Sequence, residues 1–358
     1  MLSYILKRLL LIIPTLFGIM LINFAIVQFA PGGPVEQMIA KLEHYDTDAT
    51  SRFSGASRET MSTEGAYQGA RGVDPALVKE IKKMYGFDKP ATTRFWMMLK
   101  NYLTFNFGTS YFQDKKVIDL IIERLPVSIS LGLWTTLLAY LICIPLGIKK
   151  AIKDGSKFDI YTSSIVIIGY AVPNFLFAVF CIVLFAGGSF WAIFPLSGIV
   201  SDHWDQLSFF GKITDYLWHM VLPVLAMAIS GFATLTMLTK NSFLDEIHKQ
   251  YVMTAYAKGN TQKRVLYRHV FRNAMLIVIA GFPAAFISIL VTGNLLIEVV
   301  FSLNGLGLLG YEAVINRDYP VLFGTLFIFT LFGLVLNLIG DLMYVLIDPR
   351  INFDRLEA

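Results

Sequence analysis

The chain has 358 residues, of which 55% are hydrophobic and 16% charged, and its mean hydropathy is +0.60. Soluble domains carry about 25% charged residues, so this composition excludes an ordinary soluble protein and favours one that lies in a lipid bilayer. The net charge of +4 comes from basic residues in short loops between apolar runs. It therefore describes membrane topology, and no nucleic-acid partner is expected.

Six stretches without Asp, Glu, Lys or Arg predict six membrane-spanning helices, because a helix needs about 20 apolar residues to cross the hydrocarbon core. They are Leu9–Ala30, Val127–Ile148, Ile160–Ser201, Tyr216–Thr239, Asn273–Ile297 and Tyr319–Gly340. The third is about twice the length of one span. Its Gly187-Gly188 pair predicts one helix that ends near Ala186, followed by an apolar loop or re-entrant segment at Phe190–Ile199.

Basic residues set the expected orientation. Lys7 and Arg8 precede the first span, and Lys149, Lys150, Lys153 and Lys157 are expected to fill the loop after the second. Short loops rich in Lys and Arg stay in the cytoplasm, so both termini are predicted to be cytoplasmic.

The segment between the first two spans is then expected on the opposite, outer side of the membrane. Residues 43–73 are rich in Ser, Thr, Gly and Ala, which predicts a flexible insertion. It is either inert or reaches a partner outside the membrane. Short amphipathic helices are expected at Ala76–Tyr85 and Thr92–Tyr102. The predicted organisation is all-α: an N-terminal tail with the first span (1–30), an outer segment (31–125), a five-helix core (126–347) and a C-terminal tail (348–358).

A polar segment, Lys240–Arg272, lies between the fourth and fifth spans and carries seven Lys or Arg against two acids. Its first part predicts a short helix, with Asp245 and Glu246 in the first turn and Gly259 in the left-handed position that ends it. Thr261 is the expected N-cap of a second helix that runs into the next span. The residues expected on one side of the first helix are Ile247, Tyr251, Val252, Ala255 and Gly259.

Three interpretations of this segment remain open. Ala255, Ala257 and Gly259 would give the first helix a thin face that another protein could approach closely. The basic residues Arg264, Arg268 and Arg272 could instead anchor the second helix at anionic headgroups. The first helix could also lie on the bilayer, although its narrow apolar face has no Leu or Trp.

The sequence from Tyr251 to Ala274, YVMTAYAKGNTQKRVLYRHVFRNA, resembles the cytoplasmic coupling loop of ABC-importer permeases of the oligopeptide/dipeptide/nickel type. The resemblance covers nearly the whole chain and is specific through the order of its motifs. The other motifs are Pro31-Gly32-Gly33-Pro34, Arg124-Leu125-Pro126, His219-x-x-Leu222-Pro223, Gly305-Leu306-Gly307, Arg317-Asp318-Tyr319-Pro320 and Asp348-Pro349-Arg350. Among these permeases, the long outer segment is most similar to the Yej-type branch, which is associated with oligopeptides and microcin C.

The resemblance implies a six-helix type I permease fold in a bacterial inner membrane. It also implies a second permease as heterodimer partner, two ATPase subunits or one fused tandem ATPase, and a periplasmic solute-binding protein. Residues 245–259 would correspond to the helix that contacts the ATPase. The residues expected to couple the permease to the ATPase are Tyr251, Val252, Thr254, Ala255, Ala257, Lys258, Gly259 and Arg264.

One departure limits the analogy. The broader importer signature has Glu-Ala-Ala before the Gly, whereas Met253-Thr254-Ala255 stands here. A single acidic residue is therefore not expected to make the ATPase contact.

The source of energy is expected to lie outside this chain. It has no Gly-x-x-x-x-Gly-Lys-Ser/Thr phosphate loop, so no enzymatic activity and no cofactor are predicted, and ATP with Mg²⁺ would bind to the partner ATPase. The charge-free spans lack the carboxylates typical of ion-coupled pumps, which disfavours a secondary transporter. A nickel or other small-solute permease and a membrane scaffold remain alternatives.

Polar residues within or next to the spans are candidates for a substrate path, since intramembrane polar groups tend to face the bundle interior. Hydrogen bonding between helices is the alternative role. The candidates are Asn174, Ser288, Thr292, Asn294, Glu298 and Asn337.

Overall fold

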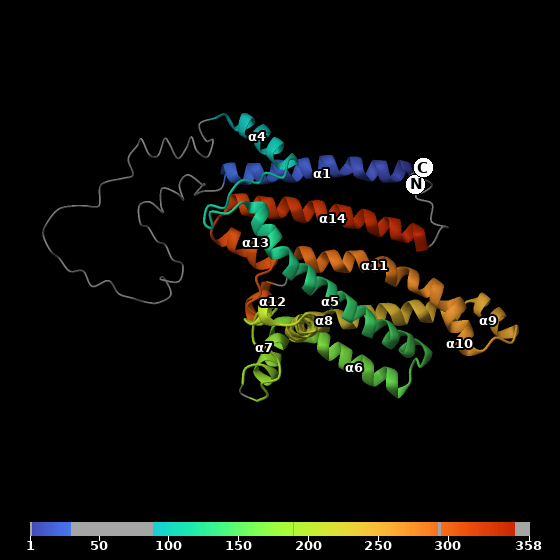
Figure 1. The fold of residues 1–358 in the computed structure, drawn as a ribbon. Coiled ribbons are helices and arrows are strands. Elements are labelled where there is room, and N and C mark those ends of the chain that lie inside the picture. The colour runs from blue at the N-terminus through green and yellow to red at the C-terminus, as the bar shows by residue number, and fades with distance from the viewer. Residues whose placement is uncertain (1, 30–88, 189, 293–294, 348–358) are drawn as a thin grey trace, which may run out of the picture. The chain divides into compact units, whose positions relative to one another are not determined.

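The computed structural model describes residues 2–29, 89–188, 190–292 and 295–347. Within these ranges the regular elements are helices, apart from one isolated β-bridge between Thr109 and Lys116 (Figure 1). The α-helices are α1 (Leu2–Phe29), α4 (Ala91–Leu103), α5 (Val117–Ile152), α6 (Lys157–Ala171), α7 (Asn174–Phe185), α8 (Phe209–Ile247), α9 (Gln250–Ala257), α10 (Gln262–Val265), α11 (Phe271–Thr292), α12 (Leu295–Val300), α13 (Leu306–Ile315) and α14 (Tyr319–Ile347).

Five helices in the described ranges are long and apolar enough to cross a membrane, or six if the bent pair α6–α7 counts as one span. This agrees with the six predicted spans. Many large apolar side chains on these helices are exposed, as expected where lipid takes the place of water. The predicted segment 43–73 and the predicted helix Ala76–Tyr85 lie outside the described residues, whereas the helix predicted at Thr92–Tyr102 is confirmed as α4.

The third apolar stretch differs from the prediction of one helix to about Ala186. It forms α6 and α7, which meet at an angle of 97°. The break lies at Val172 and Pro173, where Val172 is extended with φ −83° and ψ 121°. Proline has no N–H to donate and disfavours a helical residue before it, so Pro173 explains the bend. Helix α7 ends at Phe185, just before Gly187-Gly188 as predicted.

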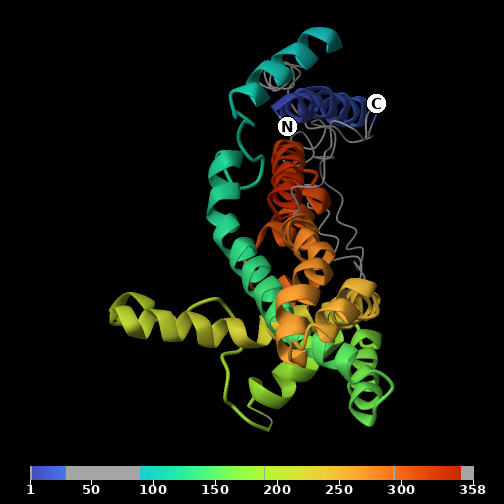
Figure 2. The ribbon, with the colours of Figure 1, turned by 90° about the vertical axis from the view of Figure 1, so that its right-hand side faces the viewer.

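The described residues divide into two compact units, of which the larger contains 119–312, apart from the gaps named above, together with 2–13 and 325–347. In this unit α8 packs against α6, α7 and α11 (Figures 1 and 2). One apolar core joins α5, α7, α8 and α12 and contains Leu131, Cys181 and Phe301. A second core lies at the other end of α8 and joins α5, α8, α9, α10 and α11.

The smaller unit contains, among the described residues, 14–29, 89–118 and 313–324. Phe95 of α4 packs edge-to-face against Phe17 and Phe24 of α1. Asp318 accepts hydrogen bonds from the Ser110 hydroxyl and the Tyr111 N–H. The aromatic contacts hold α4 against α1, and the hydrogen bonds to Asp318 fix the segment at Ser110 and Tyr111, shortly before α5.

Candidate functional site: the loop between α8 and α11

The polar segment Lys240–Arg272 forms the last two turns of α8, then α9, α10, a π-helical segment (Leu266–Val270) and the start of α11. In Figure 1, α9 and α10 lie beyond the end of α8. Helix α8 continues to Ile247. The prediction that Asp245 and Glu246 begin the short helix was therefore wrong, because both residues extend α8 and α9 begins only at Gln250.

Helix α9 ends as the sequence predicted. Gly259 has φ +78°, a left-handed conformation that glycine adopts without strain. The Asn260 N–H donates to the Ala255 carbonyl at 3.4 Å, and the Gly259 N–H donates to the Tyr256 carbonyl at 2.8 Å. These two bonds form a Schellman motif, which satisfies the last carbonyls of the helix. The Asn260 side chain adds a third bond, to the Ala255 carbonyl at 2.9 Å.

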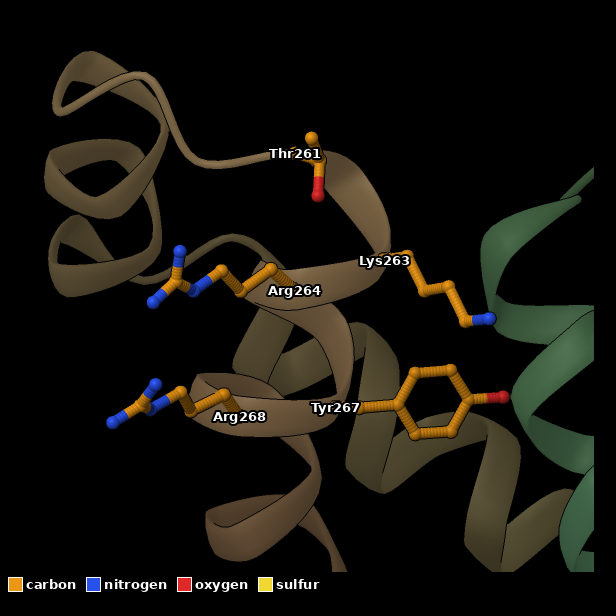
Figure 3. A pocket seen from close by; sticks show the side chains of 5 residues that line it. All are labelled: Thr261, Lys263, Arg264, Tyr267 and Arg268. Carbon is orange, nitrogen blue, oxygen red and sulfur yellow. The ribbon is translucent and has the colours of Figure 1, made fainter.

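Thr261 is the residue before α10, as predicted for an N-cap, but its side chain makes no capping hydrogen bond there. Downstream, the π-helical segment adds an extra residue to one turn. Figure 3 shows Arg264 and Arg268 pointing to one side of this helix and Lys263 and Tyr267 to the other. With Thr261 these four residues line an open hollow of about 530 Å³. Its lining is basic.

The inner face of α9 is fixed by apolar packing. Val252 is fully buried, and Ala255 is 6% exposed. Both belong to the core that contains Ile148 of α5, Phe243 of α8 and Val265 of α10. These two predicted coupling residues are therefore covered by their own chain, and their place is to hold α9 against α8 and α10.

Polar contacts attach the start of α9 to α8. The Tyr251 hydroxyl donates to a Glu246 carboxylate oxygen at 2.6 Å, and Lys249 pairs with the same carboxylate. Burial, together with this hydrogen bond, raises the pKa of Tyr251 to about 12. The phenol therefore remains a hydrogen-bond donor at physiological pH.

The outer face of α9 consists of exposed side chains that a partner could touch. Thr254, Ala257, Lys258 and Gly259 were predicted members of the coupling site and are exposed, as is Arg264 of α10. Two further exposed residues of this face were not predicted: Met253, which is 65% exposed, and Tyr256, which is 38% exposed. Helical periodicity was the available signal, since Met253 lies three positions before Tyr256 and four before the predicted Ala257, and this spacing places residues on one face of a helix.

Three of the six predicted substrate-path residues lie within the described structure, on α7, α12 and α14. Asn174 is half-buried at the start of α7, and Asn337 is exposed on α14. Glu298 of α12 is buried, and its carboxylate accepts hydrogen bonds from the backbone N–H groups of Leu308 at 2.7 Å and Gly307 at 3.4 Å. This carboxylate thus binds the first turn of α13. The side chains of Ser288 and Thr292, and the whole of Asn294, lie outside the described residues.

Comparison with known proteins decides the family. Residues 143–353 match the family described as "Binding-protein-dependent transport system inner membrane component". The chain belongs to this family. It is a permease subunit of an ABC importer, a multi-pass protein of the inner membrane with no ATPase site of its own.

Three relatives show how closely this permease follows known ones. It is 60% identical to the peptidoglycan transport system permease protein YejB of Agrobacterium fabrum, over 99% of both chains. It is 58% identical to the inner membrane ABC transporter permease protein YejB of Escherichia coli O157:H7, over 98% of this chain and 99% of that one. The oligopeptide transport system permease protein AppB of Bacillus subtilis is 33% identical, over 99% of this chain and 100% of that one.

Membership of the family also establishes the general working context. A binding-protein-dependent importer needs a partner permease, an ATPase and a binding protein in addition to this chain. The family resemblance inferred from the coupling loop is thus confirmed for nearly the entire chain.

Proposed function

We propose that this permease forms half of the translocation pathway of an importer for oligopeptides or peptide-like compounds. The observation that carries the cargo class is the full-length similarity to permeases named for peptidoglycan and oligopeptide transport. A peptide backbone offers repeated donors and acceptors, which suits a path of low side-chain specificity. Microcin C stays a narrower prediction within this class. None of the relatives named above supports nickel as cargo.

We also propose the composition of the complex: one second permease as heterodimer partner, two ATPase subunits or one fused tandem ATPase, and a periplasmic solute-binding protein. Both termini of the permease would lie in the cytoplasm. This orientation follows from the basic residues beside the spans, and it places α9 on the side of the membrane where ATP is available.

Helix α9 is the proposed contact with the ATPase. The support is its architecture: an inner face buried in the chain's own core, a closed C-terminal motif at Gly259, and an outer face of exposed residues. A helix held in this way moves as a unit with the helices on which it packs. Tyr251, Val252 and Ala255 would position α9, while Met253, Thr254, Tyr256, Ala257, Lys258 and Arg264 would face the ATPase.

The test of this function combines deletion with purification. Cells without the gene should lose ATP-dependent uptake of a radiolabelled tetrapeptide pool, and a plasmid copy should restore it. A tagged chain extracted in mild detergent should bring an ATPase and a second permease with it. Uptake of the peptides by the purified chain alone, in proteoliposomes with an ion gradient, would refute the proposal.

Substitution of Gly259 is expected to impair transport more than folding. Alanine at φ +78° costs about 1–2 kcal/mol, and a β-branched Val costs more, because its side chain is stiffest. The space around the position is open, with no atom within 4 Å of an added Cβ, so no clash is expected. Peptide uptake should be highest for Gly259→Asn, because Asn tolerates a left-handed backbone. It should be lower for Gly259→Ala and lowest for Gly259→Val. The amount of permease in the membrane, measured by immunoblot, should change little; equal uptake by all three variants would contradict the expectation.

A further inference from the structure

Three charged residues from three helices meet in a buried cluster near the end of α5. Asp159 of α6 lies between Lys150 of α5 and Lys240 of α8. One carboxylate oxygen is 2.9 Å from the Lys150 ammonium, and the other is 2.7 Å from the Lys240 ammonium. Lys240 also pairs with Asp154 at 2.7 Å. The two lysines and two aspartates balance in charge.

The hydrogen-bond and ion-pair partners of the Lys150 ammonium all lie on α6. The lysine side chain is 0% exposed, and its ammonium donates to the Asp159 carbonyl at 2.9 Å, the Thr162 hydroxyl at 3.0 Å and the Ser163 hydroxyl at 2.6 Å. A buried ammonium is stable only with such partners. Lys150 was predicted in the loop after the second span, whereas α5 continues to Ile152 and makes this residue a link between α5 and α6.

Asp159 is held in place by the turn before α6. Ser156 caps that helix by accepting a hydrogen bond from the Asp159 N–H at 3.3 Å. The Asp159 carboxylate in turn accepts one from the Gly155 N–H at 3.2 Å. The carboxylate is thus fixed relative to the α6 axis, and both lysines bind to a rigid acceptor.

The charged cluster lies on the same helices on which α9 packs. The core on which α9 packs contains residues of α5 and α8, among them Ile148 and Phe243, but no described residue of α6. Lys150 lies two residues after Ile148 on α5, and Lys240 lies three before Phe243 on α8. Helices α5 and α8, on which α9 packs, therefore also supply the two lysines that bind Asp159. Each lysine lies within one helical turn of a core residue of its own helix.

We propose that Lys150, Asp159 and Lys240 form an interhelix joint that makes α6 follow displacements of α9. Through α6 the displacement would reach the bent α6–α7 pair. The proposal rests on the proposed function, in which the ATPase acts on α9. Lys240 is a positioning residue: it is 11% exposed and pairs with two aspartates of its own chain, and it sets how α6 responds to displacements of α8.

Lys240 is also the member that can be removed with least damage to the fold. Without it, Lys150 and Asp159 still neutralise each other inside the protein. Asp154, its other partner, is 53% exposed and can be solvated. Lys240→Met keeps the length of the apolar stem and removes the ammonium, with its charge and its hydrogen-bond donors. Lys240→Arg keeps the charge, and Lys157→Met serves as matched control, because Lys157 is exposed in the same region.

The experiment measures the distance between α6 and the α9–α10 region in the assembled importer, purified through a tagged full chain and placed in nanodiscs. Spin labels go on Tyr161→Cys of α6, which is 68% exposed in the parent, and on Gln262→Cys, exposed at the start of α10. Cys143 and Cys181, both buried, are first replaced by Ala. Distances are recorded by pulsed electron paramagnetic resonance without nucleotide and with ATP plus vanadate.

The labelled parent, Lys240→Arg and Lys157→Met should each give one narrow distance distribution that is the same in both states. Lys240→Met should broaden the distribution without nucleotide and shift its mean with ATP plus vanadate. A Lys240→Met distribution as narrow and as constant as that of the parent would overturn the joint. The measurement without nucleotide tests the joint even if the purified permease carries no ATPase. A preparation that carries no ATPase would instead contradict the proposed function.

Discussion

Asp159→Asn is expected to leave little folded permease in the membrane. The substitution removes the carboxylate that neutralises a fully buried Lys150 and an 11%-exposed Lys240. Breaking a buried ion pair in this way costs about 3–5 kcal/mol, because the remaining charge has no compensating partner. That is a large part of the total stability of about 5–15 kcal/mol that a folded protein has.

The measurement is the yield of monodisperse, fluorescently tagged permease after detergent extraction, followed by its thermal denaturation. Asp154→Asn is the matched control, since Asp154 pairs with the same Lys240 but is 53% exposed. Exposed pairs contribute about 1 kcal/mol or less, so this variant should denature near the parent temperature. Similar yields and temperatures for the two variants would show that the buried cluster is not needed for folding.

Gly147→Val should separate α5 from α8. A Cβ at Gly147 would lie 2.6 Å from the Thr239 Cβ and 2.9 Å from the Thr236 carbonyl oxygen. Neither atom is at the free end of a flexible chain, and both threonines are fully buried. Small residues let membrane helices approach closely. The larger side chain must therefore move a helix, at a cost near the upper end of the ~1–3 kcal/mol typical of overpacking.

Gly231→Ala on α8 provides the comparison, because an added Cβ there meets no atom within 4 Å. It should leave the denaturation temperature unchanged or raise it, since alanine favours a helix more than glycine does. Gly147→Ala should fall between this control and Gly147→Val. If Gly147→Val denatured at the parent temperature in the same assay, the close contact of α5 and α8 would not be a determinant of stability.

The parts of the fold that follow from local physics were predictable from the sequence. Long charge-free stretches predicted the membrane-spanning helices, since a helix needs about 20 apolar residues to cross the hydrocarbon core. Gly259 predicted the end of α9, because few other residues adopt a positive φ without strain. The order of motifs around Tyr251–Ala274 reported the family, which the full-length relatives confirm.

The parts that depend on tertiary packing were not predictable in the same way. The basic residues after the second span were expected in a loop, but Lys150 is buried because Asp159, Thr162 and Ser163 happen to lie around it. Such a pocket has no signature in a single sequence. Likewise, the small residue Ala255 was expected on a face open to a partner, whereas the fold uses it to pack α9 against its own core.

Pro173 shows a third limit. Its chemistry predicts that a helix stops before it. The sequence did not give the angle of 97° between α6 and α7. That angle reflects the packing of both helices on α8 and of α7 on α12.

The central claim is that the outer face of α9 contacts an ATPase. Site-specific photo-crosslinking from position 253 tests it most directly, because Met253 is 65% exposed on that face. A photoreactive residue there should form an adduct with an ATPase subunit, identified by mass spectrometry. The same residue at the buried position 252 should form only internal adducts. Adducts from position 253 with lipid alone, in cells that make the intact importer, would contradict the account.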